Sequence, residues 1–63
     1  MNKEIVWTIS YGDHCLVMET RNKECDEKDR KVELPSVALI LFMKRLSTKY
    51  CNRGYAVLFD VDC

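Results

Sequence analysis

The chain has 63 residues, of which 48% are hydrophobic, and its ten basic side chains balance ten acidic ones. This length and hydrophobic fraction correspond to one small globular domain over residues 1–63, and the zero net charge argues against a dedicated nucleic-acid-binding protein. The first residues, MNKEIVW, lack the long apolar segment of a secretory signal, so we expect a cytoplasmic protein.

The first predicted element is a β-hairpin over residues 3–21. From Lys3 to Tyr11 apolar and polar residues alternate, which is typical of a half-buried strand. Gly12 and Asp13 then provide turn chemistry, and a second extended run follows over residues 14–21. The inner face is predicted to carry Ile5, Trp7, Ile9, Tyr11, Leu16 and Met18, and the outer face Val6, Thr8, Cys15 and Val17.

Residues 22–33 are predicted to form a charged loop outside the core. From Asn22 to Lys31 there are eight charged residues, four of each sign, and no large apolar one. We therefore expect a solvated, mobile connection, with docking on a partner as the alternative. Its four acidic residues do not indicate calcium, because lysines interrupt them and the glycine of an EF-hand loop is missing. Residues 31–34 are compatible with a short edge strand.

A helix is predicted over residues 36–52, around the apolar run from Val37 to Met43. Pro35 suits a first helical turn, Ser36 suits an N-cap, and Gly54 suits a left-handed stop. Two basic residues follow the apolar run directly, so it is too short to cross a membrane.

The second half of this helix is basic. Lys44, Arg45, Lys49 and Arg53 gather there, and no acidic residue occurs over residues 34–54. Such a cluster complements the negative end of the helix dipole, and it also offers a surface to an acidic partner or to RNA phosphates.

Residues 55–62 alternate again and form the last predicted strand. The order is then β-β-α-β, an α+β fold in which one helix packs on one face of a three-stranded, mainly antiparallel sheet. We favour the strand order 2-1-3, with the third strand antiparallel to the first, because the strand over residues 3–11 is the most apolar and suits the centre. The predicted core consists of Ile5, Trp7, Ile9, Leu16, Met18, Leu39, Phe42, Met43, Leu46, Tyr50, Val57, Phe59 and Val61.

The four cysteines indicate reduced thiols rather than a metal site or a disulfide scaffold. Cys15, Cys25, Cys51 and Cys63 lack the C-x₂-C spacing of a zinc site, and no secretory signal accompanies them. A Cys51–Cys63 disulfide is conceivable, but the two residues lie at opposite ends of the last strand.

Catalytic motifs are also missing. His14 is the only histidine, and its neighbour Cys15 points to the opposite face of a strand, which prevents a Cys–His pair. Asp60 and Asp62 share a strand face but have no evident partner acid or base. With two glycines in the whole chain, phosphate-binding loops are excluded. We therefore expect no enzyme, no cofactor and no metal.

The remaining signal is a surplus of apolar residues, on several sides of the helix and on the far side of the sheet. Patches of this kind mark interfaces when they stay exposed. The candidate partner-binding residues are Val37, Ile40, Leu41, Lys44, Arg45, Lys49, Arg53, Val6, Val17 and Leu58.

These features predict a small non-enzymatic intracellular protein–protein binding module, whose partner is another protein or a second copy of the chain. Its size and lack of catalytic groups are typical of phage or mobile-element accessory proteins that inhibit or neutralise a host protein. The alternative is a small homodimeric nucleic-acid-binding or regulatory protein that uses the basic half of the helix.

Overall fold

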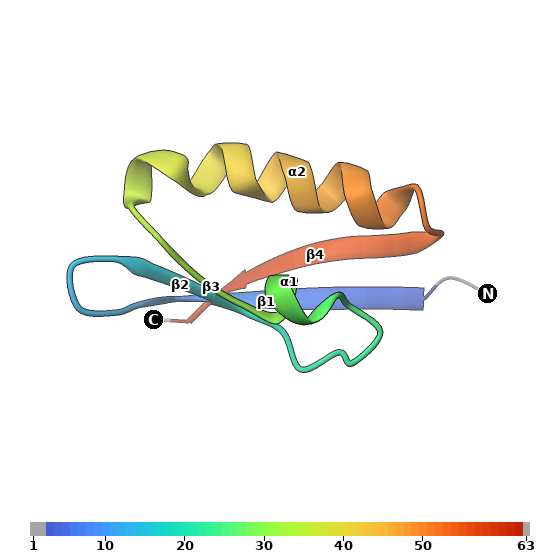
Figure 1. Ribbon diagram of the computed structural model, residues 1–63, viewed down its shortest axis with the longest axis horizontal. Coiled ribbons are helices and arrows are strands. Elements are labelled where there is room, and N and C mark those ends of the chain that lie inside the picture. The colour runs from blue at the N-terminus through green and yellow to red at the C-terminus, as the bar shows by residue number, and fades with distance from the viewer. Residues whose placement is uncertain (1–2, 63) are drawn as a thin grey trace.

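The computed structural model describes residues 3–62. Within that range four strands form one mixed sheet, and one long helix lies across one of its faces (Figure 1). We call the face toward this helix the inner face and the opposite one the outer face. The elements are β1 (Lys3–Tyr11), β2 (Leu16–Glu19), α1 (Glu27–Arg30), β3 (Lys31–Leu34), the 3-10 turn η1 (Ser36–Ala38), α2 (Leu39–Cys51) and β4 (Tyr55–Val61).

The strand order is β3-β2-β1-β4. β1 pairs antiparallel with β2 and β2 antiparallel with β3, whereas β4 lies parallel to β1, with Trp7 opposite Phe59. The α+β class and the position of the last strand beside the first are thus confirmed. Two predictions are wrong: the sheet has four strands instead of three, and the last strand is parallel instead of antiparallel to the first. The reason is that β3 adds one reversal of the chain before α2.

Residues 22–33 contain two elements, α1 and most of β3, and part of the core. Cys25 is 2% exposed and Asp29 is 7% exposed, so the expectation that this stretch stays outside the core is wrong for these two residues. β3 forms because Val32 and Leu34 face inward beside Met18 and Leu16 of β2.

The predicted helix over residues 36–52 begins as η1 and becomes an α-helix at Leu39. The N-cap of η1 is Pro35 and that of α2 is Ala38, so the assignment of Ser36 as the N-cap is wrong. Gly54 has φ +91°, as a left-handed stop requires. In the described part of the chain, no helix combines the length and apolar character needed to cross a membrane.

The core centres on Trp7, which is fully buried between α2 and the sheet. Its ring lies 5.4 Å from that of Tyr50 and 6.1 Å from that of Phe59, measured between centroids. The other buried hydrophobic residues are Ile5, Ile9, Leu16, Met18, Cys25, Leu34, Leu46 and Tyr50. Most of the predicted core is therefore confirmed.

One aromatic and one aliphatic residue, both predicted to face inward, are exposed. Tyr11 is 84% exposed and Val61 is 60% exposed. α2 lies close to β4 at its C-terminal end and rises away from it toward its N-terminal end (Figure 1), so the ends of β1 and β4 lie where the helix covers the sheet least. For the same reason Phe42 and Met43 are only half-buried, whereas Leu46 and Tyr50 are sealed.

Candidate functional site

A cluster of hydrogen bonds joins α1 to the C-terminal half of α2. The Asp29 Oδ2 accepts from the Tyr50 hydroxyl at 2.6 Å and from Lys49 Nζ at 2.7 Å. Lys49 Nζ also contacts Asp26 Oδ2 at 2.8 Å, and Arg53 donates to both oxygens of Asp26 at 3.1 and 3.3 Å. The charged segment is thereby fastened to the helix.

Trp7 and Tyr50 complete this cluster from the core side. Trp7 Nε1 donates to the Asp29 backbone carbonyl at 2.9 Å, and the Tyr50 hydroxyl accepts the Asp26 backbone N–H at 3.0 Å. In the part of the chain that the structure describes, no buried side-chain nitrogen or oxygen lacks a hydrogen-bond partner. The cluster is therefore satisfied by the protein itself and needs no ligand.

The ionisation equilibria reflect these contacts. Hydrogen bonds from Arg53 and then from Lys49 hold the pKa of Asp26 well below its ordinary value. Burial acts to raise the pKa of Asp29, but the hydrogen bonds from Lys49 and Tyr50 outweigh it and keep that pKa low. Burial, and then the hydrogen bond to Asp29, raise the pKa of Tyr50 to about 12. Both carboxylates are thus ionised, and the phenol is neutral, at neutral pH.

The predicted basic cluster divides into two pairs. Lys49 and Arg53 are engaged inside the molecule by Asp26 and Asp29. Lys44 and Arg45 are exposed, and neither forms a salt bridge with a described carboxylate. Sequence reasoning missed the division because the partners of Lys49 lie 20 or more residues away in a stretch that reads as a loop.

A groove of about 670 Å³ lies between α2 and the α1–β3 edge of the sheet. Its apolar lining comes from Val32 of β3 and from Phe42 and Leu46 of α2. The guanidinium of Arg45 lies 5.9 Å from the centroid of the Phe42 ring, which it partly covers. The polar lining consists of Lys28, Asp29, Lys44, Arg45, Thr48 and Lys49. This surface, which we call the basic groove, combines apolar side chains with four cations.

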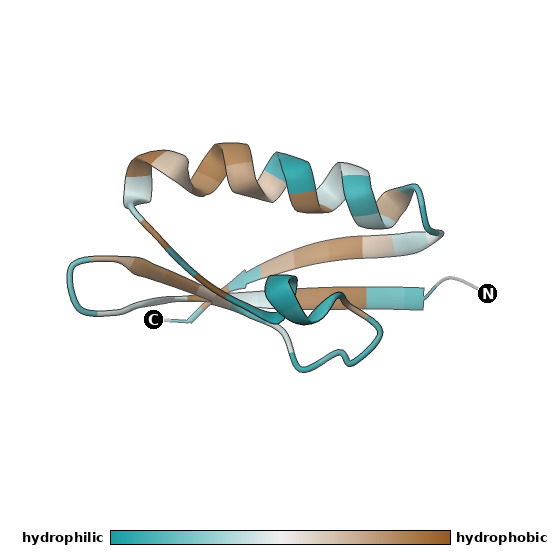
Figure 2. Cartoon of the chain, in the orientation of Figure 1, coloured by the Kyte–Doolittle hydropathy of each residue, from teal (hydrophilic) through white to brown (hydrophobic). Residues whose placement is uncertain are grey.

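The apolar candidates on the helix are exposed. Val37 is 90% exposed, Ile40 62% and Leu41 65%. Figure 2 shows that most hydrophobic residues of α2 lie in its N-terminal half, whereas hydrophobic and polar residues, the buried Leu46 and Tyr50 among them, mix in its C-terminal half. Leu41 precedes Arg45 by one helical turn but does not line the basic groove. Ile40 lines a second hollow, toward β4, which shares Lys44 and Thr48 with the groove.

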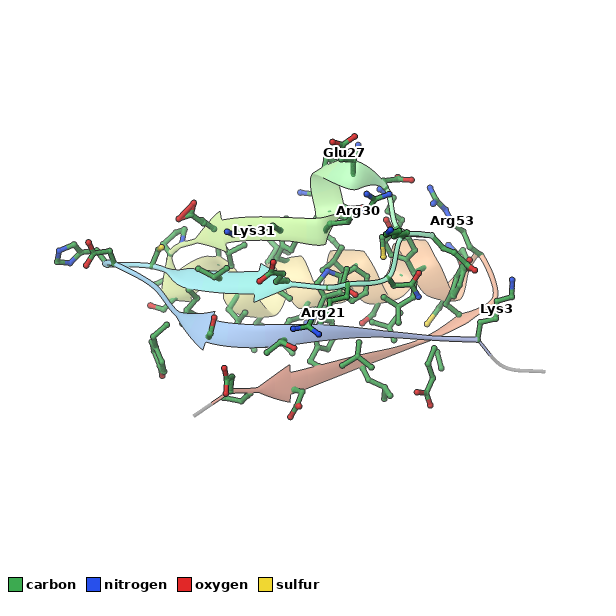
Figure 3. All side chains as sticks on the ribbon, turned by 90° about the horizontal axis from the view of Figure 1, so that it is seen from below. Lys3, Arg21, Glu27, Arg30, Lys31 and Arg53 are labelled. Carbon is green, nitrogen blue, oxygen red and sulfur yellow. The ribbon has the colours of Figure 1, made fainter. Side chains whose placement is uncertain are left out.

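The outer face of the sheet carries the remaining candidates. Val6 is 40% exposed and Leu58 45%, while Val17 is half-buried. Arg21 lies over this face (Figure 3), beside a hollow of about 530 Å³ whose lining is mostly polar. The outer face is therefore a mixed surface rather than one apolar patch.

His14 and Cys15 line one open hollow at the hairpin turn together with Ser36, and Asp60 lies apart from them on β4. His14 lies exposed in the hairpin turn with φ +61°, and Asp60 is exposed on the outer face. Within residues 3–62, no three histidine, cysteine or acidic side chains converge as metal ligands would. Cys63 and its conceivable disulfide with Cys51 lie outside the described residues.

Comparison of the chain with protein-family models, with curated proteins and with solved structures finds no match in any of the three. The function is therefore argued from the described residues. Two features bear on it most: the cations around the basic groove, and the apolar side chains that continue from it along α2.

Proposed function

We propose that the protein is a small non-enzymatic binding module that holds an acidic, amphipathic segment of another protein in the basic groove. The observation that carries the proposal is the charge of the lining. The groove has four cations, and its single carboxylate, Asp29, is already paired with Lys49. Lys28, Lys44 and Arg45 form no salt bridge with any described carboxylate and are available to an outside one.

The apolar part of the groove supports a partner segment that also has an apolar side. Val32 and Phe42 of the lining are half-buried and Leu46 is buried. Leu41 lies outside the lining, one helical turn before Arg45 and 65% exposed, where a bound segment can reach it. An amphipathic peptide satisfies both halves of this surface, because its apolar side chains pack on these apolar residues while its carboxylates meet the cations.

The same cations would attract nucleic acid, but the rest of the groove favours a peptide. Phe42 is the aromatic residue of the lining, and it is half-buried beneath the Arg45 guanidinium. It therefore offers no open ring on which a base can stack. A module without catalytic groups acts by occupancy, so inhibition of the partner through its bound segment is the mode of action that fits.

The test is selection from an unbiased display library of peptides of about 15 residues, long enough for about four helical turns. We expect enriched peptides to be net acidic, with apolar residues at helical spacing. In fluorescence anisotropy at about 50 mM salt, the Lys44→Glu, Arg45→Glu double variant should bind them at least about tenfold more weakly.

The matched control is Lys23→Glu with Lys31→Glu, two exposed cations that do not line the groove. It should keep binding within about twofold. Leu41→Ser should weaken peptide binding and leave the protein folded, because Leu41 is 65% exposed. Enrichment of peptides without acidic residues would contradict the proposal. A second result would also contradict it: no peptide is enriched, and the protein binds single-stranded DNA in a way that the Lys44→Glu, Arg45→Glu variant abolishes. That result would favour a nucleic-acid-binding protein.

A further inference from the structure

β4 forms an edge of the sheet with little of the usual protection, since Asp60 is its single charged residue. It stands at one end of the strand order, and Figure 3 shows no other element beyond it. The opposite edge strand, β3, is four residues long, begins with Lys31 and is followed by Pro35, all features that discourage pairing. β4 has seven residues with no lysine and no proline. A long apolar edge of this kind is a template for another strand.

The free backbone groups of β4 can be assigned. The Asp62 N–H donates to the Ile9 carbonyl at 2.9 Å, so the even-numbered residues at this edge point their N–H and C=O groups toward β1. By alternation, the odd-numbered residues point theirs away from the sheet. These residues are Tyr55, Val57, Phe59 and Val61.

We propose that β4 pairs antiparallel with β4 of a second copy of this chain, with Leu58 on the two-fold axis. In this register Val57 lies opposite Phe59 of the second copy, and Tyr55 lies opposite its Val61. All four free positions are then hydrogen-bonded pairs, which gives about eight backbone hydrogen bonds across the junction. The product is one continuous eight-stranded sheet.

The side chains match in the same register. On the inner face each pair joins an aromatic ring to a β-branched side chain, a favourable cross-strand combination. On the outer face the two Leu58 side chains, each 45% exposed in the single chain, meet at the axis. Asp60 lies opposite Ala56 of the second copy, so the two carboxylates are not opposed. A shift that placed Asp60 opposite Asp60 would be repulsive.

The helix side of this edge is also apolar. A hollow of about 410 Å³ lies between α2 and β4, lined in part by Ile40, Met43 and Phe59. Ile40 is 62% exposed and Val61 is 60% exposed. A second copy across β4 brings the same residues toward this hollow from the other side of the axis.

The number of hydrogen bonds indicates the size of the contact. Standard interfaces bury about 800 Å² per partner, about one-sixth of the 4776 Å² accessible surface of this chain. At the usual density, about eight hydrogen bonds correspond to about 800–1,600 Å² of total interface, or about 400–800 Å² per partner, which reaches the standard size at its upper end. The hollow and the basic groove share Lys44 and Thr48, but the rest of the groove is lined from α1, β3 and the other flank of α2. The inference is argued from β4 and does not depend on the proposed function.

The test is the mass of the full chain by light scattering and sedimentation, with reductant present to exclude intermolecular disulfides. We expect a dimer of twice 7.4 kDa. Leu58→Lys and Leu58→Asp each place like charges on the axis and should raise the dissociation constant at least about tenfold. Mixing the two variants should restore a dimer, because lysine then faces aspartate; a variant that had merely unfolded would not recover.

Val6→Lys is the matched control, since Val6 is the neighbour of Leu58 on the outer face but lies on β1, away from the edge. It should remain dimeric. A wild-type chain that stays monomeric at about 0.5 mM would overturn the inference, as would a dimer that neither Leu58 variant weakens. The wild type, the two Leu58 variants and the Val6→Lys variant are expected to bind peptides in the basic groove equally well.

Discussion

Asp29 is a carboxylate that the fold places in the core, with 7% of the residue exposed. Burial of an unpaired charge is costly, and here Lys49 and Tyr50 supply the hydrogen bonds that make it tolerable. The backbone of the same residue satisfies the indole N–H of Trp7. One residue of the charged segment thus serves both the core aromatic cluster and the helix.

Asp29→Asn should lower the free energy of unfolding at pH 7 by about 1.5–3 kcal/mol, the usual contribution of hydrogen bonds to a charged group. Although burial acts to raise it, the pKa of Asp29 is held below its ordinary value of 3.8 by the hydrogen bonds from Lys49 and Tyr50. The contribution of this carboxylate is therefore complete above about pH 4 and is lost as the pH falls through the lowered pKa. Urea unfolding at a series of pH values measures the difference.

The matched variant is Asp60→Asn, which changes an exposed carboxylate on the outer face and should alter stability by less than about 0.5 kcal/mol. If Asp29→Asn were as stable as the wild type at pH 7, or if its cost did not shrink in acid, the hydrogen bonds to Asp29 would not stabilise the fold.

At the scale of elements, α2 is an apolar helix that the sheet covers unevenly. Leu46 and Tyr50 are sealed, while Ile40 and Leu41 of the first turns are open. Periodicity predicted this helix and the strands β1 and β4, because each is long enough to show a repeat. α1 and β3 have four residues each, which is too short to show a periodic pattern. β3 is stabilised by a non-local contact, the pairing of Val32 with Met18 of β2.

Two leucines of α2 test the uneven covering. Leu46 is 2% exposed and Leu41 is 65% exposed. Leu46→Ala should cost about 2–5 kcal/mol, because it leaves a cavity under the helix, out of the roughly 3–9 kcal/mol available to a domain of this size. Leu41→Ala should cost less than about 0.5 kcal/mol. Circular dichroism during urea unfolding gives both values, and similar losses in the two variants would show that α2 does not pack as described.

At the scale of the whole molecule, one short strand decides the topology. Adding β3 to the hairpin reverses the chain once more and makes β4 parallel to β1. The candidate site shows the same limit. Its helix residues Lys44 and Arg45 were predicted from their clustering, but Lys28 was missed because it lies in the segment predicted as a charged loop. Val32 lies in the short edge strand that residues 31–34 were compatible with, but it was not predicted to line a site. Charge pairing over 20 or more residues leaves no local pattern to read.

The same contacts predict that the charged segment unfolds only with the whole domain. Cys25 is 2% exposed within it, and Cys51 at the end of α2 is exposed and provides an internal reference. Alkylation followed by mass spectrometry should modify Cys51 at once and Cys25 about 10²–10⁶-fold more slowly, as global unfolding of about 3–9 kcal/mol requires. Urea should accelerate the reaction of Cys25 with the slope of global unfolding. If Cys25 instead reacted quickly at a rate that urea did not change, residues 22–30 would open on their own, as expected for the mobile connection that their composition predicts.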